Sequence, residues 1–420
     1  MFARHRLRIA ELRPSHSLVM LIEALRAHLL AGHVIPAHPL ALTENLAIDE
    51  QHQRALTRYY VAAGAGGMAV GVHTTGFPIH DPKIGLYEPV LALAQETASD
   101  ALRQNALPAR SSAARSSSAS TSLAVPSSAI ANRGAPASAN AAATAGATIA
   151  VDHRNREFVR VAGLVGRTEQ ALREAAIANK LGYDCGLLSL GAWRDATSSE
   201  ILAHCRHVAD AIPLFGFYLQ PAVGGRVLDY NFWRGFCEIS NVVAIKVAPF
   251  NRYATLEVVR AVADSGRSDI ALYTGNDDSI VSDLVTDASS VNANTSAPPF
   301  VGGLLGQWAV WTQSAVGMLN EIRAWRATGN AGIPREWLRL GANLTEANAA
   351  IFDVANNFAG CLPGILEVLR QQGLVRNTLT FDDHERLSPG QTELIASVRA
   401  RFPYLTDDAF VAEHRDAWLR

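Results

Sequence analysis

The sequence predicts an α/β fold, a (β/α)8 TIM barrel with a C-terminal helical appendage, and three observations carry this prediction. Eight apolar segments of strand length alternate with eight segments of helical periodicity between residues 33 and 329. The strand segments are continuous apolar runs, which is typical of parallel strands buried on both faces. No GxGxxG follows the first of them, which argues against a dinucleotide-binding sheet. Eight such units in series favour a closed barrel over an open doubly wound sheet.

The expected elements follow one another in regular order. We expect strands at 33–40, 66–75, 157–166, 184–191, 213–221, 241–250, 269–277 and 300–306. We expect the helices that follow them at 49–63, 88–98, 168–182, 198–212, 229–239, 253–266, 278–286 and 310–329. Residues 17–31 form an expected amphipathic helix before the first strand. Helical segments at 335–356, 360–372 and 391–401 form the expected appendage.

Two segments of biased composition interrupt this pattern. Residues from about 103 to 152 are almost all Ala and Ser, with few large apolar side chains that could offset the entropy of ordering them. We expect a disordered insertion there, away from the active site, and a shorter loop at 286–299. The predicted organisation is therefore an N-terminal arm and helix (1–32), a barrel that contains the insertion (33–330) and a C-terminal helical region (331–420).

Composition bounds the function and the compartment. The 37 basic and 39 acidic residues nearly cancel, so no charged field indicates nucleic acid or an anionic membrane as a partner. No apolar run is long enough to span a bilayer. The four cysteines lie far apart without a CxxC pair, which favours a reducing, cytoplasmic location. The first thirteen residues carry four arginines; we favour a plain basic arm, and a mitochondrial presequence is the alternative.

Lysine is scarce in this chain, and one lysine lies where a barrel enzyme needs a nucleophile. Only Lys83, Lys180 and Lys246 are lysines. Lys246 lies within VVAIKVAP on the sixth predicted strand, and active sites of such barrels lie at the C-terminal ends of the strands. Burying an ammonium costs several kcal/mol unless it is paired or neutral, and a neutral amine attacks carbonyl carbon. We predict Lys246 as a Schiff-base nucleophile; a lysine that reaches solvent from the strand end is the alternative.

Other strand ends supply candidate partners for Lys246. Tyr218 ends the preceding strand, and neighbouring strands lie about 4.8 Å apart, so its phenol is expected to reach the amine and relay protons. Thr74, Thr75 and Gly76 end the second strand. Hydroxyls and N–H groups in such a turn suit a carboxylate, although an ordinary strand-to-helix turn explains these residues equally well.

The N-terminal histidines allow a metal-site hypothesis. His33, His38, His73 and His80 lie near the first two strands together with Asp81. No HxH or HExxH spacing is present, so we expect no metal and no other cofactor.

The order of these motifs resembles the dihydrodipicolinate synthase/N-acetylneuraminate lyase family of class I aldolases. The matching residues are the strand-two Thr-Thr-Gly, Tyr218 with Pro221, Lys246, and the strand-seven run Gly275-Asn276-Asp277-Asp278. The resemblance covers about residues 33–102 and 157–375. Four features depart from the family: Phe77 replaces an acid after the Thr-Thr-Gly turn, YLQP replaces YNVP, Val223 stands near the place where several members have a strand-five arginine, and LGAWRD replaces a tyrosine-rich loop.

The resemblance implies an activity and a role for each matching residue. Lys246 would form an imine with a 2-keto acid such as pyruvate, and Tyr218 would relay protons. Thr74, Thr75 and the Gly76 amide would hold the substrate carboxylate, with Gly275 and Asn276 as further substrate-binding residues. The family also implies a homo-oligomer, a dimer or a tetramer.

Three functional hypotheses stay open at this point. The first is a Schiff-base-forming lyase or aldolase that acts on pyruvate or another 2-keto acid. The second is a catalytically altered relative that binds a keto acid or a partner without turnover, for which Phe77 and Val223 are the motive. The third is a metal-dependent barrel lyase that uses His38 and His73.

Overall fold

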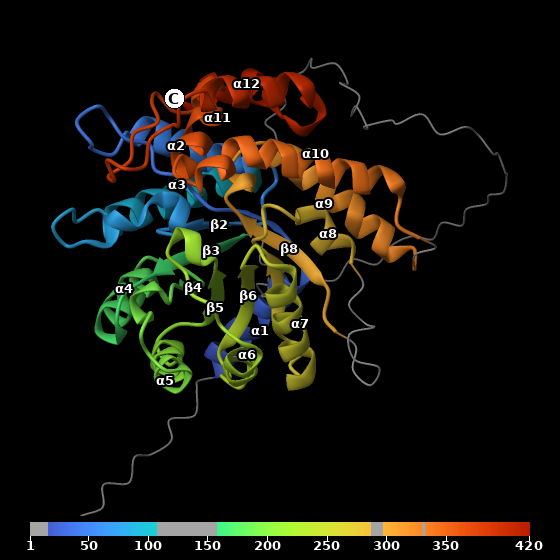
Figure 1. The fold of residues 1–420 in the computed structure, drawn as a ribbon. Helices are drawn as coiled ribbons and strands as arrows, with labels where there is room; N and C mark the ends of the chain where they lie inside the picture. The colour runs from blue at the N-terminus through green and yellow to red at the C-terminus, as the bar shows by residue number, and fades with distance from the viewer. Residues whose placement is uncertain (1–15, 107–157, 287–296, 330–331) are drawn as a thin grey trace, which may run out of the picture.

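The computed structural model describes residues 16–106, 158–286, 297–329 and 332–420. Within these ranges, eight parallel strands form one sheet in the order β1-β8-β7-β6-β5-β4-β3-β2. The two outer strands of this order meet through a parallel bridge between Ala37 and Ala69, and the His38 N–H donates to the Ala69 carbonyl over 2.8 Å. The sheet is therefore a nearly closed (β/α)8 barrel with helices outside it and a helical C-terminal region (Figure 1), as the sequence predicts.

The strands are short, and helices lie between successive strands. The strands are β1 (Val34–Pro36), β2 (Gly67–Val70), β3 (Val159–Leu164), β4 (Cys185–Leu188), β5 (Leu214–Leu219), β6 (Val242–Ala248), β7 (Ala271–Thr274) and β8 (Phe300–Leu305). The barrel helices are α2 (Glu50–Ala62), α3 (Tyr87–Ala106), α4 (Thr168–Lys180), α5 (Ser198–Ala209), α6 (Tyr230–Cys237), α7 (Arg252–Ser265), α8 (Ile280–Val285) and α9 (Thr312–Ala327).

Side chains of each strand alternate between the barrel lumen and the surrounding helices. In β6, Ala244 and Ala248 belong to the cluster that fills the lumen, whereas Ile245 and Val247 pack against the helices. Both faces are buried, which explains the continuous apolar runs of the sequence. Local signals end the elements: the Asn251 side chain caps α7 by accepting from the Ala254 N–H, and Gly266 takes a left-handed conformation where this helix ends.

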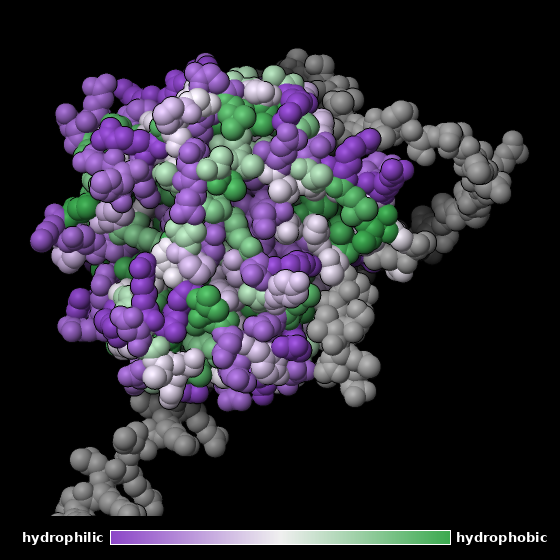
Figure 2. All heavy atoms as spheres, in the orientation of Figure 1, coloured by the Kyte–Doolittle hydropathy of each residue, from purple (hydrophilic) through white to green (hydrophobic). Residues whose placement is uncertain are grey.

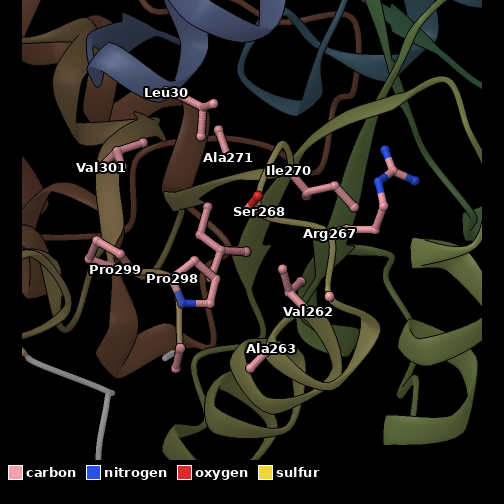
Figure 3. A pocket seen from close by; sticks show the side chains of 13 residues that line it. Leu30, Val262, Ala263, Arg267, Ser268, Ile270, Ala271, Pro298, Pro299 and Val301 are labelled. Atoms are coloured by element: carbon pink, nitrogen blue, oxygen red, sulfur yellow. The ribbon is translucent and has the colours of Figure 1, made fainter. Parts of the chain in front are cut away.

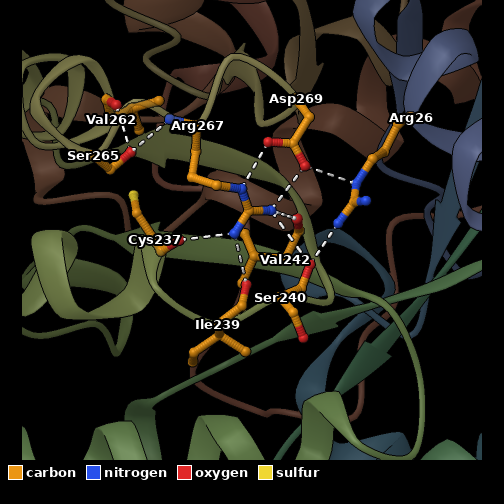
Figure 4. A network of polar contacts seen from close by, with 9 residues as sticks. All are labelled: Arg26, Cys237, Ile239, Ser240, Val242, Val262, Ser265, Arg267 and Asp269. Atoms are coloured by element: carbon orange, nitrogen blue, oxygen red, sulfur yellow. Dashed lines mark hydrogen bonds and ion pairs between the residues drawn. The ribbon is translucent and has the colours of Figure 1, made fainter. Parts of the chain in front are cut away.

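Helix α1 (His16–Ala31) lies against the N-terminal end of the barrel. Its Leu25 and Leu29 join the lumen cluster, and the Tyr273 hydroxyl donates to the Leu29 carbonyl over 2.8 Å. Figure 4 shows the polar contacts that hold this end of the barrel together. There the Arg267 guanidinium donates to the carbonyls of four residues, Cys237, Ile239, Ser240 and Val242, and to the Asp269 carboxylate. Arg26 of α1 joins this network through an ion pair with Asp269 at 3.0 Å.

The C-terminal region packs on the barrel and reaches the opposite end. It contains α10 (Arg335–Ile351), α11 (Cys361–Gln371), α12 (Gln391–Arg401) and α13 (Asp408–Trp418), which Figure 1 shows above the barrel strands. The helix α13 was not predicted. Its Trp418 packs on Tyr59 of α2 at a ring-centroid distance of 5.5 Å. Phe352, Phe358 and Cys361 of this region lie at the mouth where β6 and β7 end.

Several element bounds differ from the sequence prediction. The first strand has three residues instead of eight, because Pro36 and Pro39 each lack an N–H for the ladder. Residues His73–Thr75 form a 3₁₀ turn instead of strand. Helix α3 extends to Ala106, into the start of the predicted insertion. The rest of that insertion, most of the 286–299 loop and the arginine-rich arm lie outside the described residues.

The face of the molecule shown in Figure 2 carries both hydrophilic and hydrophobic residues. Figure 2 shows hydrophobic residues in separate small groups, one of them near the start of α10, where Ile333 and Leu338 are exposed. None of the helices in the described ranges is both long and apolar enough to cross a bilayer.

Candidate active site

Lys246 lies in the barrel lumen near the C-terminal end of β6. Its side chain is 7 % exposed. In the strand register it is the direct neighbour of Phe217 on β5 and of Tyr273 on β7, so all three side chains lie on the lumen face. The Lys246 Nζ lies 4.5 Å from the centre of the Phe217 ring. An aromatic face stabilises a nearby cation without sharing a proton with it.

A small cavity surrounds the Lys246 amine and adjoins a larger vestibule. The cavity has a volume of about 40 Å³, and its lining consists of His73, Thr74, Leu219, Gln220, Val223, Lys246, Ala248, Phe250, Gly275, Asp277, Gly306, Phe352, Phe358, Cys361 and Ile365. The vestibule has a volume of about 640 Å³. Four residues line both spaces, namely His73, Val223, Phe358 and Cys361. The cavity is large enough for a small molecule or a few waters, and the vestibule could hold a second group.

Lys246 shares this cavity with one buried carboxyl group, Asp277. Burial lowers the pKa of the Lys246 ammonium to about 8, although the charges of Asp277 and Cys361 act in the opposite direction. Burial likewise raises the pKa of the Asp277 carboxyl above its usual range, against the effect of Lys246. The Asp277 Oδ1 accepts from the Gln307 N–H over 3.1 Å. A lysine with such a lowered pKa has a substantial fraction of neutral, nucleophilic amine near neutral pH.

Gly275 provides the space that the Lys246 side chain occupies. A Cβ atom at position 275 would lie 2.7 Å from the Lys246 Cε and 2.7 Å from the Ala248 Cβ. The Gly275 N–H donates to the Val247 carbonyl over 2.8 Å, which fixes the backbone beside the lysine. Gly275 therefore belongs to the site as a packing residue.

The structure does not bring Tyr218 to Lys246, and this part of the prediction is wrong. Tyr218 pairs with Val247 in the strand register, so it lies on the opposite face of the sheet from Lys246. Its ring packs on Trp233 of α6 at a centroid distance of 5.3 Å, and its hydroxyl accepts from the Leu228 N–H over 3.2 Å. The β5 neighbour of Lys246 in the structure is Phe217, one residue earlier. A shift of one residue reverses the face of every side chain in a strand.

The Thr-Thr-Gly turn is only partly available to a ligand. Thr75 Oγ1 accepts from the N–H groups of Gly71 and Val72 and donates to the His38 carbonyl over 2.7 Å. The Gly76 N–H donates to the His73 carbonyl within the turn. Both groups therefore stabilise the turn itself. Thr74 is the member of the turn that lines the cavity beside Lys246.

The Asn276 side chain is also engaged in hydrogen bonds within the protein. Its Nδ2 donates to Thr255 and to Asp283, and its Oδ1 accepts from the Phe250 N–H over 3.0 Å. These contacts hold the end of β7 against α7, α8 and the end of β6. They do not place the amide in the cavity, so the predicted contact of Asn276 with substrate has no support in the geometry.

Several residues that line the cavity or contact Lys246 were not predicted as site residues. Two of them could have been predicted from the sequence: Phe217 directly precedes Tyr218, and Asp277 belongs to the strand-seven motif. His73 was considered only as a metal ligand. Gln220 lies between Tyr218 and Pro221 and carried no separate signal. Phe358, with a left-handed φ of 68°, comes from the C-terminal region, and no local pattern in the sequence links it to the barrel mouth.

The structure does not support the metal hypothesis. Among the described residues, no three or more His, Cys, Asp or Glu side chains are grouped so that they could hold a metal ion. His38 is fully buried, and its ring nitrogens lie 2.8 Å from the Pro39 carbonyl and 2.9 Å from Thr57 Oγ1. His38 is therefore a core residue.

A third hollow, shown in Figure 3, lies at the N-terminal end of the barrel. Its volume is about 450 Å³ and its lining is mostly apolar, with Leu30, Pro298 and Val301 among the residues that face it. Arg267 is the charged residue of this lining, and its guanidinium is already engaged in the network of Figure 4. The other polar side chain of this lining is that of Ser268, and none of the predicted site residues belongs to the lining.

Comparison with known proteins shows the fold. No protein-family model and no curated protein matches the sequence. A monomeric dihydrodipicolinate synthase variant matches 90% of this chain and 98% of its own, with a TM-score of 0.62 and 15% identity. YagE of Escherichia coli K12, solved with pyruvate, matches 89% and 98%, with a TM-score of 0.60 and 14% identity. N-acetylneuraminate lyase of Fusobacterium nucleatum matches 89% and 99%, with a TM-score of 0.58 and 14% identity. The chain therefore has the fold of these proteins over nearly its whole described length.

Proposed function

We propose that this protein is a Schiff-base-forming lyase or aldolase of the dihydrodipicolinate synthase type that acts on pyruvate or another 2-keto acid. The observation that carries the proposal is the buried Lys246 amine, with its lowered pKa, at the C-terminal end of β6. The structural likeness to YagE, whose structure contains pyruvate, supports the choice of ligand. Assembly into a dimer or tetramer and a cytoplasmic location stay predictions.

The cavity suggests how a keto acid would bind. The Lys246 amine would attack the keto carbon, and loss of water would leave a protonated imine. This imine attracts electrons, so a neighbouring C–C bond can break or an enamine can form. Thr74 and Gln220 line the same cavity, and their side-chain groups have no hydrogen-bond partner within the described part of the chain. The Thr74 hydroxyl and the Gln220 amide are therefore candidate donors to the substrate carboxylate.

Reductive trapping tests the proposal. The protein is incubated with pyruvate and borohydride, and the intact mass and the modified peptide are then measured. We expect the mass of one reduced adduct, located on Lys246, and no adduct in a folded Lys246→Ala variant. Lys180→Arg is the matched control, because Lys180 is 72% exposed and pairs with Glu88 on the outer surface; this variant should react like the wild type. An unchanged mass with pyruvate and with a panel of other 2-keto acids would contradict the proposal.

The second candidate is a binding protein that keeps the keto-acid site without turnover. The position of Tyr218 outside the cavity favours it, because the proton relay expected from the sequence is missing there. Keto-acid binding that survives Lys246→Ala, without adduct or turnover in the wild type, would support this candidate.

A further inference from the structure

The proposed imine chemistry needs a group that moves protons in the cavity, and Tyr218 does not supply it. Converting an imine to an enamine removes a proton from the carbon next to the imine carbon, and the reverse step returns it. Four residues in the cavity lining carry side chains that exchange protons, namely His73, Lys246, Asp277 and Cys361. To act on a bound keto acid, such a residue must have a titratable group that is not engaged in other interactions.

Three of these residues are poorly suited to the task. Lys246 is the nucleophile, so its nitrogen is part of the imine. The Asp277 carboxyl accepts from the Gln307 N–H and interacts with the Lys246 charge. Burial raises the pKa of the Cys361 thiol well above its usual range, so this thiol stays protonated. His73 is the remaining candidate.

The position of His73 fits the role. It begins the 3₁₀ turn that follows β2, and its ring lines both the cavity with Lys246 and the outer vestibule. Phe77 packs beside it at a centroid distance of 5.7 Å. Neither ring nitrogen has a hydrogen-bond partner within the described part of the chain, in contrast to those of His38. A neutral imidazole at the junction of the two spaces could therefore contact both the imine and a group that enters from the vestibule.

We propose that His73 is the acid–base residue of this active site, an inference that rests on the proposed function. A ring nitrogen takes a proton from C3 of the Lys246 imine, and the C–H electrons form the C2–C3 double bond of the enamine. The electrons of the C=N double bond move onto the nitrogen, which thereby loses its positive charge. In the reverse step the imidazolium returns the proton to C3. No oxidant, reductant or further reactant is needed.

The charge state of His73 agrees with this direction of transfer. Burial, and secondarily the Lys246 charge, lower the pKa of His73 to about 4. The imidazole is therefore neutral near pH 7 and begins the reaction as the base. The low basicity also means that the proton is readily returned to carbon.

Deuterium exchange of pyruvate tests the role without knowledge of the natural substrate. The protein is incubated with pyruvate in D2O, and loss of the methyl proton signal is followed by NMR. We expect His73→Asn to lower the exchange rate at least about 100-fold, with reductive trapping on Lys246 changed by less than about threefold. His207→Asn on the exposed face of α5 is the control and should exchange like the wild type. Added imidazole should restore part of the exchange in His73→Ala, because the vestibule adjoins this position.

The outcomes separate the two proposals. Exchange that persists in a His73→Asn variant that still forms the adduct would overturn the role of His73 and leave the Lys246 chemistry intact. Loss of the adduct together with exchange in His73→Asn, without rescue of His73→Ala by imidazole, would make His73 a structural or binding residue and also overturn the proposal. Absence of any adduct in the wild type would contradict the proposed function itself.

Discussion

At the scale of single residues, the Lys246 amine lies between opposing influences. Burial favours the neutral amine, whereas Asp277 and the face of Phe217 favour the ammonium. The net effect is a pKa of about 8. Near neutral pH, Lys246 is therefore mostly protonated, while a fraction of it is the neutral amine that can react.

This balance predicts the pH dependence of adduct formation. Lysine attacks as the neutral amine, so the initial rate of imine formation with pyruvate should rise about tenfold per pH unit below pH 8 and level off above it. The rate is measured by borohydride quenching over a pH series. A rate that climbs without levelling until pH 10 would indicate an unperturbed lysine and contradict the assignment.

The close contact at Gly275 predicts a second effect. In Gly275→Ala the added methyl group would lie 2.7 Å from the Lys246 Cε, so the lysine must move. We expect adduct formation to slow at least about tenfold and the free energy of unfolding to fall by about 1–3 kcal/mol. Gly317→Ala is the matched control, because a Cβ there meets nothing within 4 Å and alanine favours the helix α9. Wild-type rates in Gly275→Ala would show that the glycine is not needed.

At the scale of elements, a buried carboxyl group joins the C-terminal helices to the barrel. Asp407, just before α13, accepts from the Tyr59 hydroxyl at 2.6 Å, from the Gln313 N–H at 3.0 Å and from the Gln372 amide at 2.9 Å. These partners lie on α2, on α9 and directly after α11. One residue therefore holds four elements together, including the helix that brings Cys361 to the cavity.

We predict that Asp407→Ala weakens this junction. Its removal leaves two donors, the Tyr59 hydroxyl and the Gln313 N–H, without an acceptor, whereas the Gln372 amide also donates to Asp408 over 2.9 Å. Each unsatisfied donor costs about 1–3 kcal/mol when it stays buried, so the free energy of unfolding should fall by about 2 kcal/mol or more. Urea unfolding measures the change. Asp416→Ala on α13 is the control, because Asp416 is 77% exposed and pairs only with the neighbouring Arg415 at the surface. Equal stability of the two variants would exclude the junction.

The elements themselves were largely predictable from sequence, but the faces of the strands were not. Continuous apolar runs located β3 to β8 because such runs are long and flanked by turns and helical periodicity. A run buried on both faces carries no alternation, so LFGFYL gives no sign that Phe217 and not Tyr218 faces Lys246. The register shift between Leu214 and Phe215 makes this choice a property of the sheet. Phe358 was equally hidden, since its place in the site depends on tertiary packing.

At the scale of the whole molecule, the two ends of the barrel have different tasks. Helix α1 and the Arg267 network close the N-terminal end (Figure 4). The C-terminal end carries Lys246, its cavity and the vestibule. The separation follows the general rule that one end of this fold serves stability and the other serves chemistry.

This division predicts that the Ala/Ser-rich segment is dispensable. Its two points of attachment are Ala106, at the end of α3, and Phe158, directly before β3. A helix that follows one parallel strand returns the chain to the N-terminal end, where the next strand begins. Both attachment points therefore lie at the end opposite Lys246. Replacing residues 107–157 by a flexible linker of about ten residues should leave the rate of adduct formation within about twofold of the wild type.

A comparison of shortened chains tests whether the 107–157 segment contributes to the site. The shortened chain and the full chain are measured side by side for reductive trapping with pyruvate and for thermal unfolding. A matched deletion at the other end of the barrel, removal of residues 353–359 at the mouth, should abolish trapping because Phe358 lines the cavity. If the shortened chain stays folded but loses the adduct, the 107–157 segment contributes to the site, and the division of the barrel into a structural end and a chemical end does not hold for this protein.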